Sequence, residues 1–271
     1  MWGEIHKSTN MIALYHFDEA SGTSHSDAMD NYDLTSGSEV AAGNITSKKG
    51  KSIRTLPPNN SSTQGTLYTT VSDLQIFYQD IENVRTFGVW CYPLYSNSVY
   101  RSYSESLIAT ESYASRSPFA VYKRGNWISG SPGYLEDTFR FSFSLDVWKA
   151  NGTLDFIGGY SSQIYPYNKP YFLMVVFKPS DTGTNNGYID FYVNFVKVST
   201  QSDTGTVDTA WRLLKSYSRD RYLYISAPNS SPNGNLIFRG YIDEVFLSKD
   251  VFTEVQINNM NTDWKNSYII T

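Results

Sequence analysis

The sequence has a single cysteine, Cys91, among 271 residues, which excludes an internal disulfide. Cys91 lies in the apolar run Val89-Trp90-Cys91-Tyr92, and no histidine is near it in sequence. We therefore interpret it as a small buried core residue and not as a nucleophile.

No stretch approaches the roughly 20 apolar residues that cross a bilayer, and the N-terminal residues lack the apolar segment of a secretory signal. We expect neither membrane insertion nor export through a signal peptide.

Charge is also scarce. Asp, Glu, Lys and Arg make up 18% of the residues, with a net charge of −4 and no dense basic run. This composition gives no electrostatic basis for nucleic-acid binding. The three histidines are too few and too widely spaced for a zinc site, and no P-loop, zinc-protease or Gly-x-Ser-x-Gly motif occurs. We interpret His16 as a hydrogen-bonded structural residue.

Many short runs of alternating apolar residues, separated by Gly, Pro and Asn turns, predict an all-β protein. The predicted strands are 12–19, 66–72, 85–92, 106–110, 119–122, 139–145, 154–157, 171–177, 188–198, 221–226 and 236–247. Helical periodicity is weak before residue 252, with 212–217 as a possible exception. The lack of strand–helix alternation excludes a doubly wound or TIM-barrel fold. Neither an internal repeat nor a boundary is visible, so we expect one domain over 1–271.

The run Gly240 to Leu247 has the alternation of a strand and carries two acidic residues, Asp243 and Glu244. The alternation predicts Ile242, Glu244 and Phe246 on one face. A helix is predicted directly afterwards, because Thr253 and Gln256 form a capping box and Phe252 and Ile257 can form a hydrophobic staple.

Four segments carry a resemblance to a known family. They are Leu14 to Thr23 followed by Asp27, Thr86 to Pro93, Tyr188 to Phe195, and Phe238 to Val245. In this order they resemble laminin-G-like domains of the concanavalin A-like lectin and glucanase superfamily, although Phe195 replaces the usual glycine. The resemblance implies an antiparallel jelly-roll β-sandwich of two sheets with a short C-terminal helix. Region 94–168 is longer than a minimal member needs and matches nothing known.

The resemblance also implies a structural calcium ion. In the family such an ion often joins the N-terminal strand region to the acidic residue of the late signature, which is Asp243 here, and Asp18 and Asp27 could contribute. Oxygen ligands of this kind suit calcium. The alternative is that Asp243 caps backbone amides or pairs with a basic residue.

Relatives with this fold include glucanases, whose retaining chemistry needs two carboxylates about 5 Å apart. The Glu-x-Asp-x-x-Glu spacing that supplies them is absent. Asp243 and Glu244 are adjacent, so a regular strand would point them to opposite sides. We therefore favour a protein without catalytic activity.

Tyrosine is abundant, with 22 residues, and is frequent in 95–168 together with Ser, Gly and Asn. This mixture is typical of adaptable binding surfaces, although strands favour aromatic residues anyway. The candidate ligand-binding residues are Tyr103, Tyr113, Trp127, Tyr134, Tyr160, Tyr192 and Asn194.

These observations predict a binding or structural module that recognises a glycan or protein surface. A disulfide-free chain rich in Ser, Asn, Thr and Tyr suits a bacteriophage virion component, either a capsid decoration or a tail adhesin, that reaches the outside by lysis. The alternatives are a divergent glycoside-active enzyme and a purely structural assembly protein. Assembly as a homo-oligomer is possible.

Overall fold

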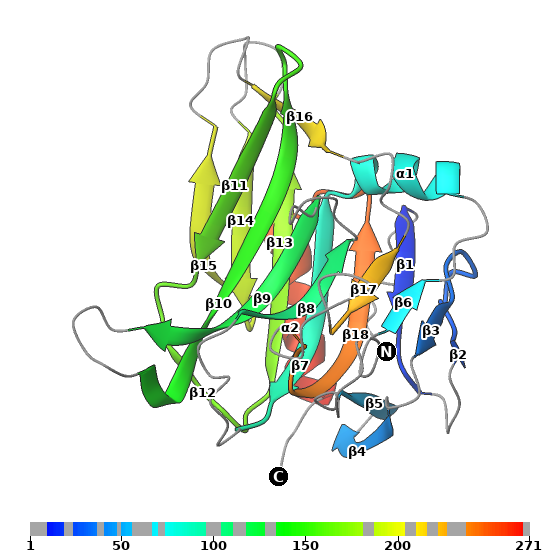
Figure 1. Ribbon diagram of the computed structural model, residues 1–271, viewed down its shortest axis with the longest axis vertical. Coiled ribbons are helices and arrows are strands. Elements are labelled where there is room, and N and C mark those ends of the chain that lie inside the picture. Colours follow the sequence, from blue (N-terminus) through cyan, green and yellow to red (C-terminus); the bar gives the residue numbers. More distant parts are fainter. Residues whose placement is uncertain are drawn as a thin grey trace.

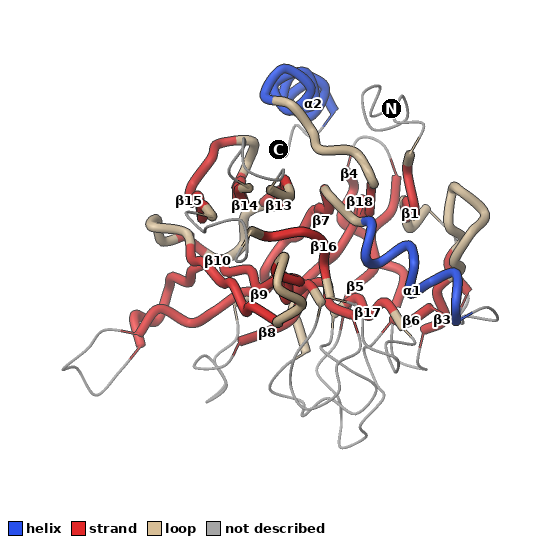
Figure 2. The backbone as a smooth tube through the Cα atoms, turned by 90° about the horizontal axis from the view of Figure 1, so that it is seen from above, coloured by secondary structure: helices blue, strands red, loops and turns tan. Residues whose placement is uncertain are grey.

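A computed structural model describes residues 10–18, 24–36, 41–47, 50–55, 67–69, 74–95, 104–110, 118–127, 134–180, 187–203, 210–215, 222–226 and 237–267. These residues form two β-sheets that lie face to face, with one helix on the outer face of one sheet and the other helix at the rim of the sandwich (Figures 1 and 2). The predicted antiparallel all-β sandwich with a short C-terminal helix is confirmed.

The first sheet has eight strands in the order β15-β14-β13-β7-β18-β5-β4, and β1 also pairs with β18. Along one edge of β18, the start of the strand pairs with β5 and its end pairs with β1. The strands are β1 (Met11–Tyr15), β4 (Ala41–Ser47), β5 (Gly50–Thr55), β7 (Thr86–Pro93), β13 (Tyr171–Lys178), β14 (Tyr188–Val193), β15 (Val196–Ser202) and β18 (Gly240–Ser248).

The second sheet has ten strands in the order β11-β10-β9-β8-β17-β6-β3-β2. The longest strand, β10, pairs with β9 and then β16 along one edge, and with β12 and then β11 along the other. The strands are β2 (Ser24–His25), β3 (Leu34–Ser36), β6 (Leu67–Thr69), β8 (Ser104–Thr110), β9 (Phe119–Trp127), β10 (Tyr134–Lys149), β11 (Leu154–Tyr160), β12 (Tyr165–Pro166), β16 (Trp211–Leu214) and β17 (Leu223–Ile225). Region 94–168, which matches no family pattern, thus builds half of this sheet.

The main hydrophobic core lies between the sheets. Phe139, Phe141 and Phe143 alternate along β10 and are all buried there, as the sequence predicts. Cys91 is a buried free thiol in the same core, and its burial raises the pKa of the thiol. Strand β13 lies at the centre of its sheet and is buried on both faces, which explains its continuous apolar run.

A second, smaller core lies on the outer face of the eight-stranded sheet, beneath helix α2 (Glu254–Ser267). Figure 2 shows α2 outside this sheet, on the side away from β8 and β9. The predicted capping box is confirmed: the Gln256 amide donates to Thr253 Oγ1 (3.3 Å), and the Thr253 amide donates to Gln256 Oε1 (2.9 Å). Phe252 and Ile257 are both buried in this core, as the staple requires.

Helix α1 (Leu74–Asn83) was not expected, because the sequence analysis found only weak helical periodicity before residue 252. The possible helix at 212–217 is wrong: residues 211–214 form β16. The polar stretch before residue 50 contains β2, β3 and β4, whose short or polar sequences lack the alternation of a long strand. Among the described residues, no helix is both long and apolar enough to cross a bilayer.

The predicted strand 188–198 is a hairpin. Asn194 and Phe195 have φ angles of 50° and 65° and form the two-residue turn between β14 and β15. Two left-handed residues match the twist of a tight hairpin, and glycine usually occupies the second position. Ile189 and Phe191 do face the inter-sheet core, as the alternation predicts, whereas Phe195 lies in the outer core beneath α2.

Candidate functional site

A β-bulge interrupts β18 at the two acidic residues. Glu244 has a left-handed φ of 46°, and the pairing register with β7 shifts between Asp243 and Phe246. Ile242 and Val245 therefore both face the inter-sheet core, while Phe246 faces α2. The predicted common face for Ile242 and Phe246 is wrong, because the extra residue reverses the alternation after Glu244.

The bulge places a cluster of carboxylates near the end of β1. Asp243 is 2% exposed and accepts a hydrogen bond from the Glu244 amide (2.9 Å). Burial, followed by repulsion from Glu244 and Asp18, raises the pKa of Asp243 well above its usual value. His16 Nδ1 lies 2.9 Å from Glu244 Oε2. Because Asp243 and Glu244 are both buried, neither carboxylate is presented to a polysaccharide chain.

An open cleft of about 350 Å³ adjoins this cluster and is lined by His16, Asp18, Ser26 and Ala28. His16 is therefore in a polar setting next to a carboxylate, in agreement with its interpretation as a hydrogen-bonded residue.

Asp27, the third predicted calcium ligand, accepts hydrogen bonds from the backbone. Its carboxylate is buried and accepts four backbone N–H groups, from Leu14 (2.8 Å), Met29 (3.0 Å), Asn31 (3.2 Å) and Tyr32 (3.1 Å). It thereby fixes the turn after β2 to the end of β1. Within the described ranges, no group of three or more His, Cys, Asp or Glu side chains is arranged to hold a metal ion. Calcium at Asp18, Asp27 and Asp243 stays a prediction.

The predicted ligand-binding residues fall in different places. Tyr103 and Tyr113 lie outside the described residues. Trp127 and Tyr134 are backbone partners at the end of the β9–β10 hairpin. Tyr160, the last residue of β11, is 55% exposed.

The two candidates on the eight-stranded sheet are used by the fold. Tyr192 is 5% exposed in the core beneath α2, and its hydroxyl donates to Asp190 (3.4 Å). The Asn194 side chain is in the hairpin turn, where Oδ1 accepts the Phe172 amide N–H (2.9 Å). Their role in ligand binding stays a prediction.

The outer face of the ten-stranded sheet presents aromatic surface beside cations. Phe156 is 54% exposed and, like Tyr160, projects outward from β11. The Arg124 guanidinium donates to the Tyr160 hydroxyl through Nη1 (2.6 Å) and to Ser104 Oγ through Nε (2.6 Å). The guanidinium carbon also lies 5.2 Å from the centre of the Tyr160 ring. The sequence analysis missed Arg124 and Phe156, although the alternation along β9 and β11 could have placed both outward.

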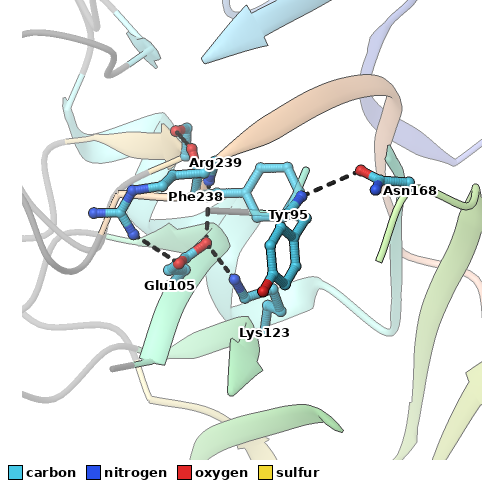
Figure 3. A network of polar contacts seen from close by, with 7 residues as sticks. Tyr95, Glu105, Lys123, Asn168, Phe238 and Arg239 are labelled. Atoms are coloured by element: carbon cyan, nitrogen blue, oxygen red, sulfur yellow. Dashed lines mark hydrogen bonds and ion pairs between the residues drawn. The ribbon is translucent and has the colours of Figure 1, made fainter. Parts of the chain in front are cut away.

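A second polar cluster lies inside the sandwich (Figure 3). Glu105 accepts hydrogen bonds from Lys123 Nζ (2.8 Å), Arg239 Nη1 (2.8 Å) and the Arg239 amide (3.1 Å), and all three side chains are buried. Lys123 Nζ also lies 4.9 Å from the centre of the Tyr167 ring. Since each charge is paired within the core, we assign this network to the fold and not to a ligand.

Comparison with known proteins gives structural neighbours only. No protein-family model matches the chain, and no curated protein matches it in sequence. Membership of the laminin-G-like family therefore stays a prediction.

Solved structures with a similar fold include binding domains of clostridial toxins. The binding domain of Paraclostridial Mosquitocidal Protein 1 has a TM-score of 0.60 at 10% identity, over 95% of this chain and 53% of that one. The binding domain of botulinum neurotoxin DC, in complex with rat synaptotagmin II, has a TM-score of 0.56 at 12% identity, over 94% and 52%. The botulinum neurotoxin serotype C1 binding domain has a TM-score of 0.55 at 12% identity, over 94% and 52%. The chain thus shares a fold with about half the length of these binding domains.

Proposed function

We propose that this chain is a non-catalytic module that recognises a glycan or protein surface. The observation that carries the proposal is the exposure of Phe156 and Tyr160 beside Arg124 on one sheet face. Large exposed aromatic residues are costly in water and are enriched where proteins bind partners. The shared fold supports it, because the neighbours are binding domains, one in complex with synaptotagmin and another tied to ganglioside interaction during cell entry.

The proposed setting is a bacteriophage virion, with the chain as a capsid decoration or tail adhesin that acts outside the host after lysis. The support is compositional: one buried cysteine, weak charge and many tyrosines. Labelling purified virions with an antibody against this chain tests the setting. Particles that lack the chain would contradict it, while leaving the binding role intact.

A glycan array, together with binding to intact bacterial cells, tests the binding role. We expect the purified protein to bind a defined set of glycans or a cell-surface protein, and to release no reducing sugar from the polysaccharides that it binds. Binding to none of these surfaces would leave the purely structural alternative. Hydrolysis would establish the glycoside-active alternative, for which the buried Asp243 and Glu244 offer no accessible pair.

A further inference from the structure

Six residues share the outer face of β9, β10 and β11, and we call this group the platform. They are Arg124, Arg140, Ser142, Phe156, Gly158 and Tyr160. Directly opposite residues of an antiparallel pair project to the same face. Arg124 is opposite Arg140, and Ser142 is opposite Tyr160, so side chains from three strands share this face. Figure 1 shows the three strands side by side.

Among the described side chains, no carboxylate neutralises the two arginines on the platform. Like charges directly opposite each other on a sheet are destabilising. The hydrogen-bond partners of Arg124 are the neutral hydroxyls of Ser104 and Tyr160, which hold the guanidinium across β10. Arg140 is exposed and makes no hydrogen bond or ion pair with any described residue. Asp146 is on the same face of β10 but is six residues from Arg140, about 20 Å along the strand, and is buried. An anionic ligand would supply the charge that the arginine pair lacks.

The other end of the platform suits the apolar face of a ring. Phe156 and Tyr160 flank Gly158 on β11, and the Phe156 ring edge lies 3.9 Å from where a Gly158 side chain would begin. The surface between the two rings therefore has no side chain standing on it. The Ser142 hydroxyl on the same face is buried, so it is not available to a ligand. The exposed guanidinium of Arg140 supplies the unused donors for a polar ligand.

We propose that the platform binds a carboxylate-bearing sugar. Its carboxylate accepts hydrogen bonds from Arg124 and Arg140, because guanidinium groups bind carboxylates through paired N–H donors. The C–H face of the pyranose ring that bears the carboxylate packs on the Tyr160 ring, where it covers exposed apolar surface. Phe156 is opposite Asp146, farther along β10 from Arg140, and it contacts the next sugar ring of the glycan. This inference rests on the proposed binding function and specifies its ligand class and its site.

The probes are a trisaccharide ending in glucuronic acid, one ending in N-acetylneuraminic acid, and the methyl ester of each. The ester keeps the ring and hydroxyl groups but removes the charge. Binding to the full chain is measured by chemical-shift titration at low and high salt. We expect at least one acid to bind about tenfold or more tightly than its ester, and salt to weaken the acid more than the ester. The two acids distinguish a uronic-acid source from a sialic-acid source.

Variants separate the two halves of the platform. Arg140→Gln removes an exposed charge without a described partner, and should make the acid bind as weakly as its ester. Phe156→Ser should weaken the acid and the ester by the same factor. The controls are Lys169→Gln, an exposed cation outside the platform, and Val255→Ser, an apolar residue that is 70% exposed on α2. Neither control should change binding.

The outcomes distinguish this site from the general function. Equal affinity for acid and ester, or unchanged acid binding by Arg140→Gln, would overturn the site. If the array still shows glycan binding in that case, the binding function stands and lies elsewhere. A glutamate-rich peptide that binds with the same dependence on Arg140, while both acids fail, would overturn the sugar in favour of a protein partner. A wild-type chain that binds neither acid, no peptide and no cell surface would overturn both the site and the proposed function.

Discussion

The ring of Phe195 stacks on the ring of Phe172, with 4.7 Å between centroids and 18° between planes. Two hydrogen bonds also join the β14–β15 turn to Phe172 of β13. The Asn194 amide donates to the Phe172 carbonyl (2.7 Å), and Asn194 Oδ1 accepts the Phe172 N–H (2.9 Å). A phenylalanine can therefore occupy a left-handed turn position that usually takes glycine, because buried stacking offsets the backbone strain.

This turn gives a first prediction. Asn194→Ala removes the acceptor for the Phe172 amide and places alanine at a φ of 50°. We expect the free energy of unfolding in urea to fall by about 1–3 kcal/mol. Asn194→Gly restores backbone freedom but not the hydrogen bond, so it should lose less. Equal losses of unfolding free energy for both variants would show that the left-handed conformation adds nothing to the cost of alanine at this position.

The inter-sheet core gives a second prediction. Phe191 is fully buried, and its ring lies 5.3 Å from the ring of Phe143 on the opposite sheet. Phe191→Ala should lower the free energy of unfolding by about 3–5 kcal/mol. Val196→Ala changes a residue of the adjoining strand that is 59% exposed, and should stay within about 0.5 kcal/mol. A loss under about 1 kcal/mol for Phe191→Ala would contradict the assigned inward face.

The buried ion network gives a third prediction. Glu105→Gln leaves the charges of Lys123 and Arg239 unneutralised inside the protein, so we expect a loss of about 3–5 kcal/mol in thermal or chemical denaturation. Lys123→Met leaves Glu105 paired with Arg239 and should cost less. The opposite order of the two losses would show that Lys123, and not Glu105, holds the network together.

The acidic cluster predicts a pH dependence. Because the pKa of Asp243 is raised in the folded chain by burial and by Glu244, folding favours the protonated carboxyl. The stability contributed by this group is complete below its unfolded pKa of about 4 and is lost as pH rises through the folded pKa. In chelator, the melting temperature of the wild type should therefore fall with rising pH relative to that of Asp243→Asn. Parallel pH curves for the two proteins would contradict the raised pKa.

Calcium would reverse this cost, because a cation beside Asp18 and Asp243 favours the ionised carboxylates. We expect added calcium to raise the melting temperature at neutral pH and chelation to lower it again. Asp243→Asn should abolish the response, whereas substituting the distant, half-buried Asp155, which pairs with Lys149, by Asn should leave the response unchanged. If neither calcium nor chelator changes the melting temperature of the wild type, the calcium prediction is wrong. Asp243 then only accepts a hydrogen bond from the Glu244 amide.

The sequence predicts most strands, because a long regular strand shows either alternating apolar residues, as in β10, or a continuous apolar run, as in β13. Prediction from the sequence fails where one residue with a left-handed backbone conformation changes the course of a strand. The bulge at Glu244 and the turn at Phe195 both use left-handed residues that are not glycine, so no sequence signal marks them. The arginine pair of the platform was missed for another reason: cross-strand register, which brings Arg124 opposite Arg140, is not visible in either strand alone.

The pairing of β1 with β18 has a consequence for synthesis. Tyr15 pairs with Val245 and Met11 with Ser248, so the eight-stranded sheet joins residues more than 200 positions apart. A ribosome must synthesise all the residues between β1 and β18 before β1 has its partner. Since such long-range pairs form late and slowly, the five residues of β1 that are buried in the folded chain have no partner strand until β18 emerges.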